Sequence, residues 1–306
     1  MIATDEYELL RETAGMVERP GRAVLELTGA EAAEFLEGQV SNAVETLDPG
    51  AGCYATLLDH KGKIRTDLRV LRLAPDRLLV DAESIGLPVL RHVFETYSLG
   101  RQVSHLDLSD DHTVLSLIGP TARQRLEPAP AEQEHAHVLT PYGVAVTTDV
   151  GVDLICGERQ AAAARSELDL PEVSENAAEC VRIESGRPRL GLDMDATTIP
   201  QEAGLNERAV NFTKGCYVGQ ETVARLHYKG KPNRHLRGLR LSTPAEHGDT
   251  IVLGDRQVGT VGSACVSPIH GPIALALIRR EASPGDEVLV GEQANSAVVV
   301  DPPFGD

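Results

Sequence analysis

Residues Ala23–Ala32, with the sequence Ala-Val-Leu-Glu-Leu-Thr-Gly-Ala-Glu-Ala, predict a strand, a glycine turn and the start of a helix that ends near Leu36. Residues Thr113–Ala122 repeat this pattern 90 positions later, with a helix that ends near Leu126. Gly29, Ala32 and Leu36 of the first copy correspond to a glycine, an alanine and a leucine 90 positions later in the second. Two copies of one pattern indicate that the chain contains two related halves.

Each copy continues with a pair of strands and a second helix. The predicted elements are strands Ile64–Leu73 and Arg77–Ala82 with helix Leu87–Tyr97 in the first half, and strands Val144–Thr148 and Val152–Cys156 with helix Arg159–Leu168 in the second. The halves span about residues 20–100 and 110–170. This β-α-β-β-α order is typical of ferredoxin-like α+β units.

The C-terminal part differs from the two halves in its pattern of apolar segments and turns. Short apolar strands there alternate with turns that contain glycine or proline, and the predicted strands are Leu236–Leu241, Thr250–Leu253, Gln257–Ser263, Ile273–Ile278 and Glu287–Val290. Such spacing predicts a small β-barrel or a sandwich. The basic segment Lys229–Arg234 precedes these strands. We therefore expect one domain over residues 1–232 and a second over residues 233–306.

Composition excludes several classes of function. A length of 306 residues favours two or three domains, and a formal charge of −17 argues against a nucleic-acid partner. The N-terminus is acidic, unlike a signal peptide, and no apolar run approaches the roughly 20 residues that span a bilayer. We expect a cytoplasmic protein with no membrane partner.

The cysteines show neither a disulfide framework nor metal-ligand spacing. There are five, all far apart in the sequence: Cys53, Cys156, Cys180, Cys216 and Cys265. No CxxC pair and no Cys/His cluster occurs among them. The pattern predicts reduced thiols and no metal site.

The segment Lys214–Glu221, with the sequence KGCYVGQE, gathers a thiol, a cation, a phenol and two glycines. A predicted strand over Ala209–Phe212 precedes it and a predicted helix over Glu221–Lys229 follows. Cys216 would then lie close to a helix N-terminus, where unpaired amides and Lys214 favour a thiolate. The alternative is a structural turn whose Cys and Tyr face the core. The density of reactive groups favours a functional site.

Two carboxylates are further candidates. Glu184 ends a predicted helix that begins near Asn176, and a carboxylate can accept two parallel hydrogen bonds from a 2-amino-4-oxo heterocycle. It could equally form a solvated ion pair with neighbouring arginines. Asp67 lies inside a predicted strand, where aspartate is disfavoured. It either belongs to a site or points to water, because Leu68 and Val70 occupy the opposite face.

Together these segments resemble the YgfZ-type folate-binding proteins, which are relatives of the glycine-cleavage T-protein, an aminomethyltransferase. The resemblance covers essentially the whole chain and rests on KGCYVGQE at 214–221, on Arg182–Leu205, on Gly38–Asn42, on the hairpin Leu57–Leu68 and on Leu117–Pro120. It implies an α+β fold with two intertwined ferredoxin-like subdomains that form a cloverleaf with a C-terminal β-barrel. A tetrahydrofolate pocket would lie among them.

The resemblance also implies roles for individual residues. Glu184 would hold the pterin, and Asp67 matches the T-protein's catalytic aspartate near the N5/N10 region of the folate. The remaining candidates for contact with the folate or for positioning the thiol are Asn42, Lys214, Tyr217, Gln220 and Glu221. The octapeptide stands where the T-protein has a Gly-Asp-Phe-type turn and brings in Cys216, which would act as nucleophile, redox group or transient ligand.

Two main functional hypotheses follow from the resemblance. In the first, the chain binds tetrahydrofolate and supports iron–sulfur cluster assembly or repair through Cys216. In the second, it is a folate-dependent aminomethyl or one-carbon transferase that depends on Asp67. A third, a partner in tRNA modification, conflicts with the charge of −17. The expected partners are a reduced folate and iron–sulfur client proteins, and we expect a monomer.

Overall fold

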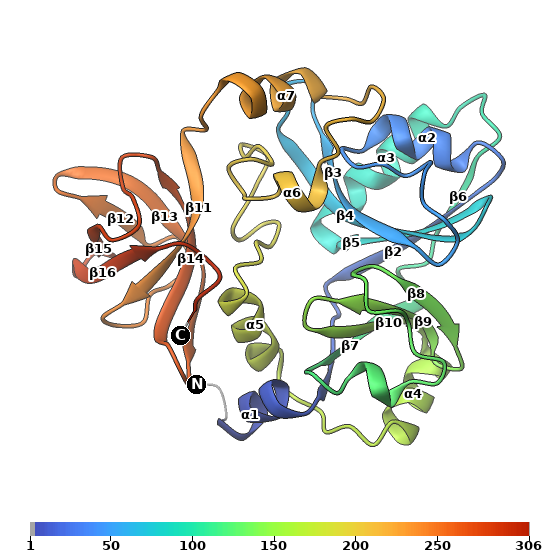
Figure 1. Ribbon diagram of the computed structural model, residues 1–306, viewed down its shortest axis with the longest axis horizontal. Helices are drawn as coiled ribbons and strands as arrows, with labels where there is room; N and C mark the ends of the chain where they lie inside the picture. The colour runs from blue at the N-terminus through green and yellow to red at the C-terminus, as the bar shows by residue number, and fades with distance from the viewer. Residues whose placement is uncertain (1–3, 306) are drawn as a thin grey trace.

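The computed structural model describes residues 4–305, which form two five-stranded sheets and a closed β-barrel. Figure 1 shows the barrel to one side of the two sheets, with α1 (Thr4–Glu12) and α5 (Glu175–Glu184) between them. The arrangement confirms the α+β class and the two-subdomain-plus-barrel architecture. Among the helices of residues 4–305, none is both long enough and apolar enough to cross a membrane.

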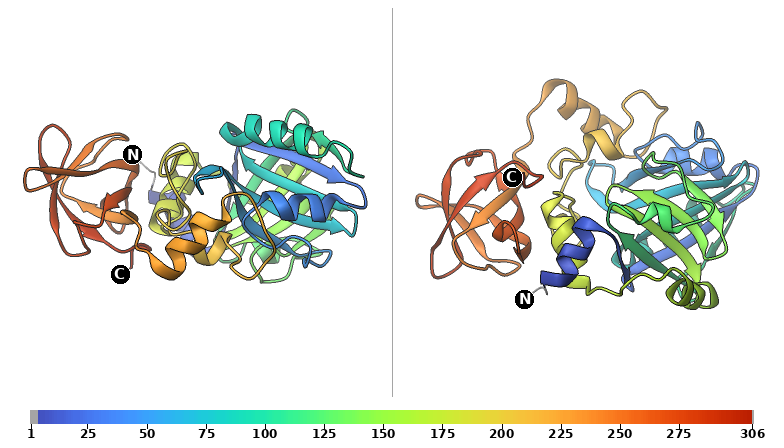
Figure 2. Two further views of the ribbon diagram at one scale, coloured as in Figure 1. Left: turned by 90° about the horizontal axis from the view of Figure 1, so that it is seen from above. Right: turned by 60° about the horizontal axis from the view of Figure 1, so that its bottom comes forward.

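The first sheet has the strand order β3-β4-β5-β2-β6. Its strands are β2 (Arg22–Thr28), β3 (Gly52–Leu58), β4 (Ile64–Ala74), β5 (Arg77–Glu83) and β6 (Ser104–Asp107). Helices α2 (Ala32–Gln39) and α3 (Leu87–Tyr97) cover one face (Figure 2, left), and Phe35 and Phe94 pack edge to face in the core between. The strands and helices predicted for this half are present.

The second sheet has the order β1-β7-β10-β9-β8. Its strands are β1 (Gly15–Glu18), β7 (His112–Ile118), β8 (His137–Thr140), β9 (Gly143–Thr148) and β10 (Gly151–Gly157), and α4 (Glu158–Glu167) packs on it. One prediction for this half was wrong. The helix expected to end near Leu126 is a single 3-10 turn, Arg123–Arg125, because the following Glu127-Pro128-Ala129-Pro130 disfavours helical backbone.

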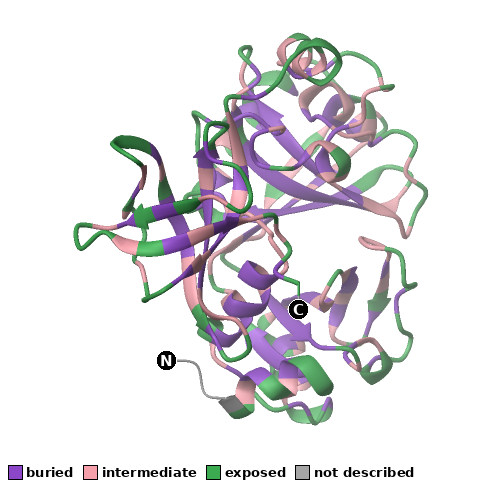
Figure 3. Cartoon of the chain, turned by 60° about the vertical axis from the view of Figure 1, so that its left-hand side comes forward, coloured by how far each residue is buried: buried purple, intermediate pink, exposed green. Residues whose placement is uncertain are grey.

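The two sheets pack against each other through the faces that carry no helices. Both contribute aliphatic side chains to this shared layer: Val24, Leu71 and Leu79 from the first sheet, and Val114, Val146 and Ile155 from the second. The strands at this interface are therefore buried on both faces, as the nearly continuous purple of the central strands in Figure 3 shows. Any polar side chain on these inner faces must find a partner within the protein or in a ligand.

The barrel closes in the order β11-β14-β13-β12-β15-β16. Its strands are β11 (Arg234–Leu241), β12 (Thr250–Leu253), β13 (Arg256–Ser267), β14 (Gly271–Arg279), β15 (Glu287–Val290) and β16 (Asn295–Val300). Strand β16, which was not predicted from the sequence, pairs with both β11 and β15 and so removes the sheet edges. The choice between barrel and sandwich depends on this strand.

Short helices connect the sheets to the barrel. The strand predicted over Ala209–Phe212 is absent: α6 (Asn206–Ala209) precedes a turn in which the Asn211 side chain accepts hydrogen bonds from the N–H groups of Thr213 and Lys214. Such an Asx turn competes with extended pairing. Helix α7 (Gln220–Lys229) agrees with the prediction.

Candidate functional site

A cavity of about 220 Å³ lies where the two sheets meet α5 and α6. Its lining contains seven arginines but only five carboxylates. In a chain with a formal charge of −17, this is a local concentration of positive charge. The cavity is therefore suited to a polar or anionic ligand.

Asp67 reaches this cavity from β4. Strand alternation directs Leu68 and Val70 into the helix-covered core, so that Asp67 faces the second sheet rather than water. The hydroxyl of Tyr54 donates a 2.5 Å hydrogen bond to Oδ2 of Asp67. The other oxygen, Oδ1, is buried and has no hydrogen-bond partner. Asp67 thus presents one free acceptor atom to the cavity.

Burial shifts the pKa of both groups of this pair. Burial raises the pKa of Asp67, although the Tyr54 hydrogen bond and the charge of Arg22 act in the opposite direction. Burial and the neighbouring Asp67 raise the pKa of Tyr54 well above its ordinary value. The phenol therefore stays protonated and keeps donating to Oδ2 at neutral pH.

Arg69 lies two residues further along β4, on the same face as Asp67. Its Nε donates to Asp81 of β5 at 2.6 Å and its Nη1 to Asp153 of β10 at 2.8 Å, which joins the two sheets. The remaining nitrogen, Nη2, is buried without a partner. Arg69 was not among the site residues predicted from the sequence. The available signal was a charge of opposite sign at position i+2 from Asp67, on the same face of the strand.

His135 completes the set from the loop that precedes β8. Its φ of 69° is left-handed, a conformation that costs free energy in a residue other than glycine. Burial, with the charges of Arg69 and Arg208, lowers the pKa of His135 to about 3, so the ring is neutral at pH 7. Its Nδ1 is buried and unpartnered. The surrounding sequence contains no signal that would have identified this histidine.

The three unpartnered atoms all belong to residues that line one cavity: Asp67 Oδ1, Arg69 Nη2 and His135 Nδ1. Buried polar atoms normally have hydrogen-bond partners, so three unpartnered atoms around one cavity offer both donors and acceptors to a ligand. A second hollow of about 570 Å³ shares several lining residues with the cavity, among them Asp149 and Ser185. A ligand longer than the cavity can therefore extend towards the surface.

Asn42 supports the cavity without lining it. Its Nδ2 donates to the carbonyl oxygens of Tyr54 at 2.9 Å and Arg208 at 3.2 Å. Arg208 in turn lies over the Tyr54 ring, with its guanidinium carbon 5.6 Å from the ring centroid. Asn42 thus positions two cavity residues from neighbouring elements.

Glu184 is buried outside the cavity lining, at the junction of α1, α5 and the barrel. Its carboxylate accepts from the Tyr7 hydroxyl at 2.9 and 2.8 Å and from the Ser267 hydroxyl at 2.5 Å. The Cys180 thiol lies 3.5 Å from Oε1. It is therefore not a solvated ion pair with neighbouring arginines. Contact with a pterin stays a prediction and would require these hydrogen bonds to rearrange.

Lys214 and Tyr217 form the buried half of the octapeptide. The Lys214 ammonium donates to the carbonyl oxygens of Glu37, Val40 and Asn42 at 2.6 to 2.9 Å, which binds the turn to the end of α2. Burial lowers the pKa of Lys214. Tyr217 packs among apolar side chains, and burial raises its pKa to about 12. Both side chains are held by the protein itself.

Cys216, Gln220 and Glu221 form the outer half of the octapeptide. Cys216 and Glu221 are exposed and Gln220 is partly exposed, and none of the three lines the cavity. The ammonium of Lys214 is directed into the end of α2 by its three carbonyl contacts. The structure therefore brings Asp67 to the cavity but does not bring Cys216 or Glu184 into its lining.

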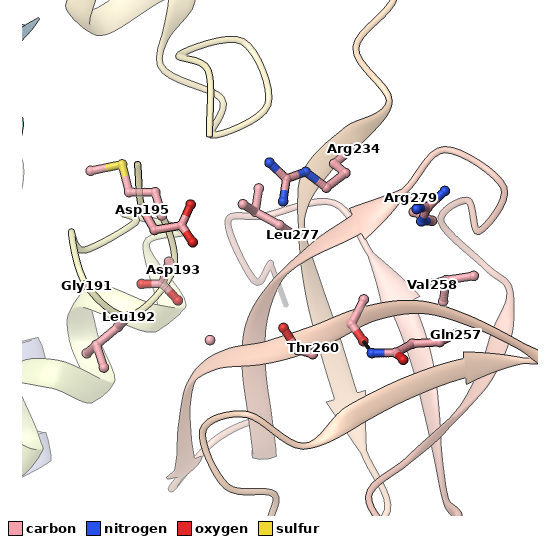
Figure 4. Close-up of a pocket in the computed structure, with 13 residues that line it drawn as sticks. Gly191, Leu192, Asp193, Asp195, Arg234, Gln257, Val258, Thr260, Leu277 and Arg279 are labelled. Carbon is pink, nitrogen blue, oxygen red and sulfur yellow. Dashed lines mark hydrogen bonds between the residues drawn. The ribbon is translucent and has the colours of Figure 1, made fainter. Parts of the chain in front are cut away.

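A further hollow of about 410 Å³ is lined by the loop Gly191–Asp195 and by the barrel (Figure 4). Its acidic groups already have protein partners. Asp193 accepts from the N–H of Ser263 at 2.7 Å, and Asp195 accepts from the hydroxyls of Thr197 and Thr198. Within residues 4–305, no cluster of three or more His, Cys, Asp or Glu side chains is arranged to hold a metal ion.

Comparison with known proteins agrees with this architecture. Residues 1–155 match the GCVT N-terminal domain, and residues 234–306 match the glycine cleavage T-protein C-terminal barrel domain. The solved aminomethyltransferase T of the Bartonella henselae glycine cleavage system superposes with a TM-score of 0.88 at 22% identity, over 98% of this chain and 89% of that one. That likeness establishes the fold.

Curated relatives extend over nearly the same length. An aminomethyltransferase of Thermotoga petrophila is 27% identical over 98% of this chain and 88% of that protein. An uncharacterized protein of Haemophilus influenzae is 28% identical over 79% of this chain and 81% of that protein. With an N-terminal family model that matches half of the sequence and a barrel model that matches its C-terminal part, the chain belongs to the glycine cleavage T-protein family.

Proposed function

We propose that this protein binds a reduced folate in the cavity between its two sheets. The observation that carries the proposal is the trio of unpartnered buried atoms on Asp67, Arg69 and His135. A pterin ring presents both N–H donors and a carbonyl acceptor, which matches a carboxylate oxygen, a guanidinium N–H and a neutral imidazole. Membership of the T-protein family supports the choice of folate among such heterocycles.

The dimensions favour a ligand held in two parts. A cavity of about 220 Å³ is smaller than the roughly 300–1,000 Å³ of pockets that enclose whole drug-sized ligands. It would hold the ring system, and the adjoining 570 Å³ hollow would hold the remainder. Arg11 and Arg123 line that hollow and suit the carboxylates of a folate tail.

Within the cavity, each residue would have a distinct role. A bound tetrahydrofolate would supply N5 and N10 as carriers of a one-carbon unit. Asp67 would accept a hydrogen bond through Oδ1 while Tyr54 holds Oδ2. Arg69 would donate through Nη2, and His135 would stay neutral because burial lowers its pKa to about 3.

The finer proposal is that the protein belongs to the YgfZ-type branch and supports iron–sulfur cluster assembly or repair, with the cluster as cargo. The support is the exposed Cys216, which lies on a turn that the buried side chains of Lys214 and Tyr217 fix to the rest of the protein. Gly215 beside it has no atom within 4 Å of an added Cβ, so that a partner has open access to the turn.

Aminomethyl transfer is the alternative. The curated relatives over the full length of the chain include aminomethyltransferases. The position of Asp67, buried beside a protonated Tyr54, favours chemistry at the folate rather than at Cys216. The two proposals share the folate and differ in the residue that acts.

Equilibrium titration with tetrahydrofolate and 5-formyltetrahydrofolate tests the shared part. We expect saturable binding by calorimetry that Arg69→Lys weakens, because lysine carries all its N–H donors on one nitrogen and lacks the planar fork that directs three nitrogens towards Asp81, Asp153 and the ligand. The exposed Asp255→Asn variant on the barrel is the matched surface control and should bind normally. Absence of binding by the folded wild-type protein would overturn the proposal.

The Cys216→Ser variant separates the two finer functions. If the protein supports cluster assembly, this variant binds folate normally but fails to restore iron–sulfur enzyme activity in cells that lack the protein. If it is a transferase, the variant still forms 5,10-methylenetetrahydrofolate from an aminomethyl donor, and Asp67→Asn does not. Full restoration by Cys216→Ser would exclude the role proposed for the thiol.

A further inference from the structure

Two cysteines that are far apart in the sequence meet at the junction of α5 and the barrel. Cys180 is buried on α5, and Cys265 is partly exposed on β13. Their sulfur atoms lie 3.4 Å apart although 85 residues separate them. Sequence spacing predicted isolated reduced thiols, since it cannot reveal a contact made by tertiary packing.

We propose that Cys180 and Cys265 form a reversible dithiol–disulfide site that cross-links α5 to the barrel. The sulfur atoms need to approach from 3.4 Å to the bonded distance of about 2.05 Å. Helix α5 packs directly against β13, so the two elements that carry the cysteines are already in contact. The site lies outside the folate cavity and stands independently of the proposed function.

Cys265 is the more exposed residue of the pair and is therefore the entry point for an oxidant. A peroxide oxidises the Cys265 thiol to a sulfenic acid, and one molecule of water is released. The Cys180 sulfur then attacks the Cys265 sulfur, the S–O bond breaks, and the hydroxide leaves with the Cys180 proton as a second water. The pair loses two electrons and the peroxide gains them.

The surroundings determine the conditions for this reaction. The hydrogen bond from Cys265, together with burial, raises the pKa of the Cys180 thiol. Because a thiolate attacks faster than a thiol, the linking step should accelerate as the pH rises. At neutral pH without an oxidant, the pair remains reduced.

The cross-link would have a structural consequence for α5. This helix carries Ala178 and Arg182 in the wall of the central cavity, and Glu184 at the barrel junction. A disulfide would bind that wall covalently to β13 and close a loop of about 85 residues in the unfolded chain. The oxidised protein should therefore unfold at a higher temperature than the reduced protein.

The test uses the full chain with Cys216→Ser, which removes the exposed thiol. The protein is treated with stoichiometric hydrogen peroxide at pH 8, alkylated after denaturation and analysed by peptide mass spectrometry. We expect one linked species joining the peptides of Cys180 and Cys265, lighter by two hydrogens and reversed by dithiothreitol. Cys53 and Cys156, buried elsewhere, are internal controls that stay alkylatable.

The variant Cys265→Ser should abolish the linked species, and circular dichroism checks that it folds. Whether or not this variant folds, the proposal is tested on the protein that retains both Cys180 and Cys265. Accumulation of sulfinic acid on Cys265 with Cys180 still alkylatable would overturn the proposal. Equal alkylation of both thiols before and after treatment would also overturn it.

Discussion

Asp67 and Glu184 are both buried carboxylates that accept a hydrogen bond from a tyrosine, yet their surroundings differ. Glu184 receives hydrogen bonds at both oxygens, from Tyr7 and Ser267, and joins α1, α5 and the barrel. Asp67 receives one at Oδ2 from Tyr54 and has no partner at Oδ1. The first carboxylate has its hydrogen bonds satisfied by the protein, whereas the second retains an acceptor for another molecule.

The difference separates structural from ligand-binding use of the same chemical group. A buried carboxylate with every oxygen satisfied contributes to stability, and its loss leaves hydroxyls without partners. A carboxylate with a free oxygen, beside the unpartnered Arg69 Nη2 and His135 Nδ1, costs stability until a ligand binds. Substitutions at the two positions should therefore act on different measured quantities.

Glu184→Gln should give the largest effect, a loss of about 3 kcal/mol in the free energy of unfolding. The amide keeps one acceptor, so hydroxyls of Tyr7 and Ser267 compete for it within a buried site. Urea unfolding measures the change, with the exposed Glu292→Gln as control. Unchanged stability together with lost folate affinity would place Glu184 among the ligand contacts instead.

Asp67→Asn should act mainly on binding. We expect the affinity for tetrahydrofolate to fall about 10- to 100-fold, which corresponds to roughly 1.5–3 kcal/mol for a hydrogen bond to a charged group. Because burial raises the pKa of Asp67, removing its charge should leave the free energy of unfolding unchanged or slightly higher. A large loss of stability with normal affinity would reverse the roles of the two carboxylates.

His135 should make stability depend on pH within the same cavity. Its pKa is about 3 in the folded protein and near 6.5 when unfolded, so between these values the unfolded chain binds the extra proton. The free energy of unfolding therefore contains a contribution from His135 that is complete above pH 6.5 and is lost progressively as the pH falls towards 3.

Between pH 7 and pH 5 the wild-type protein should lose up to about 2 kcal/mol more than His135→Asn. Asparagine tolerates the left-handed φ of 69° and does not titrate, which makes it the matched replacement. Urea unfolding at the two pH values gives the difference. Identical pH dependence in both proteins would contradict a neutral, buried His135.

A smaller contrast exists within the octapeptide, between a glycine packed closely against the protein and a glycine with open space around it. Gly219 has φ of 82°, and an added Cβ would lie 2.4 Å from the carbonyl oxygen of Asp59, whereas Gly215 has open space around it. Gly219→Ala should lower the free energy of unfolding by about 1–2 kcal/mol. Gly215→Ala should change it by less than about 0.5 kcal/mol.

Thermal unfolding of the two alanine variants, measured side by side, checks this difference. Equal destabilisation would mean that the exposed half of the turn also packs against the protein. If instead Gly215→Ala leaves stability unchanged but lowers the iron–sulfur enzyme activity in the complementation test proposed for Cys216→Ser, a partner rather than the fold needs the exposed half.

Much of the fold could be predicted from local patterns. The repeated strand–glycine–helix of Ala23–Ala32 predicted both halves, because apolar periodicity and turn glycines are local properties. The helix predicted to end near Leu126 did not form because the prolines at 128 and 130 outweighed the apolar periodicity. Strand β16 was not predicted because its partners β11 and β15 are brought together only when the barrel closes. Long-range pairing determined what local propensity could not.

The sequence by itself determined the family resemblance, the two halves and the choice of Asp67 as a candidate site residue, because motifs and periodicity are properties of contiguous segments. Only the tertiary structure decided which polar atoms have partners. It joined Arg69 and His135 to Asp67 at one cavity, satisfied Glu184 at the barrel junction and brought Cys180 to Cys265. Hydrogen bonding and burial depend on residues distant in the chain, and these contacts arise only when the sheets and barrel pack.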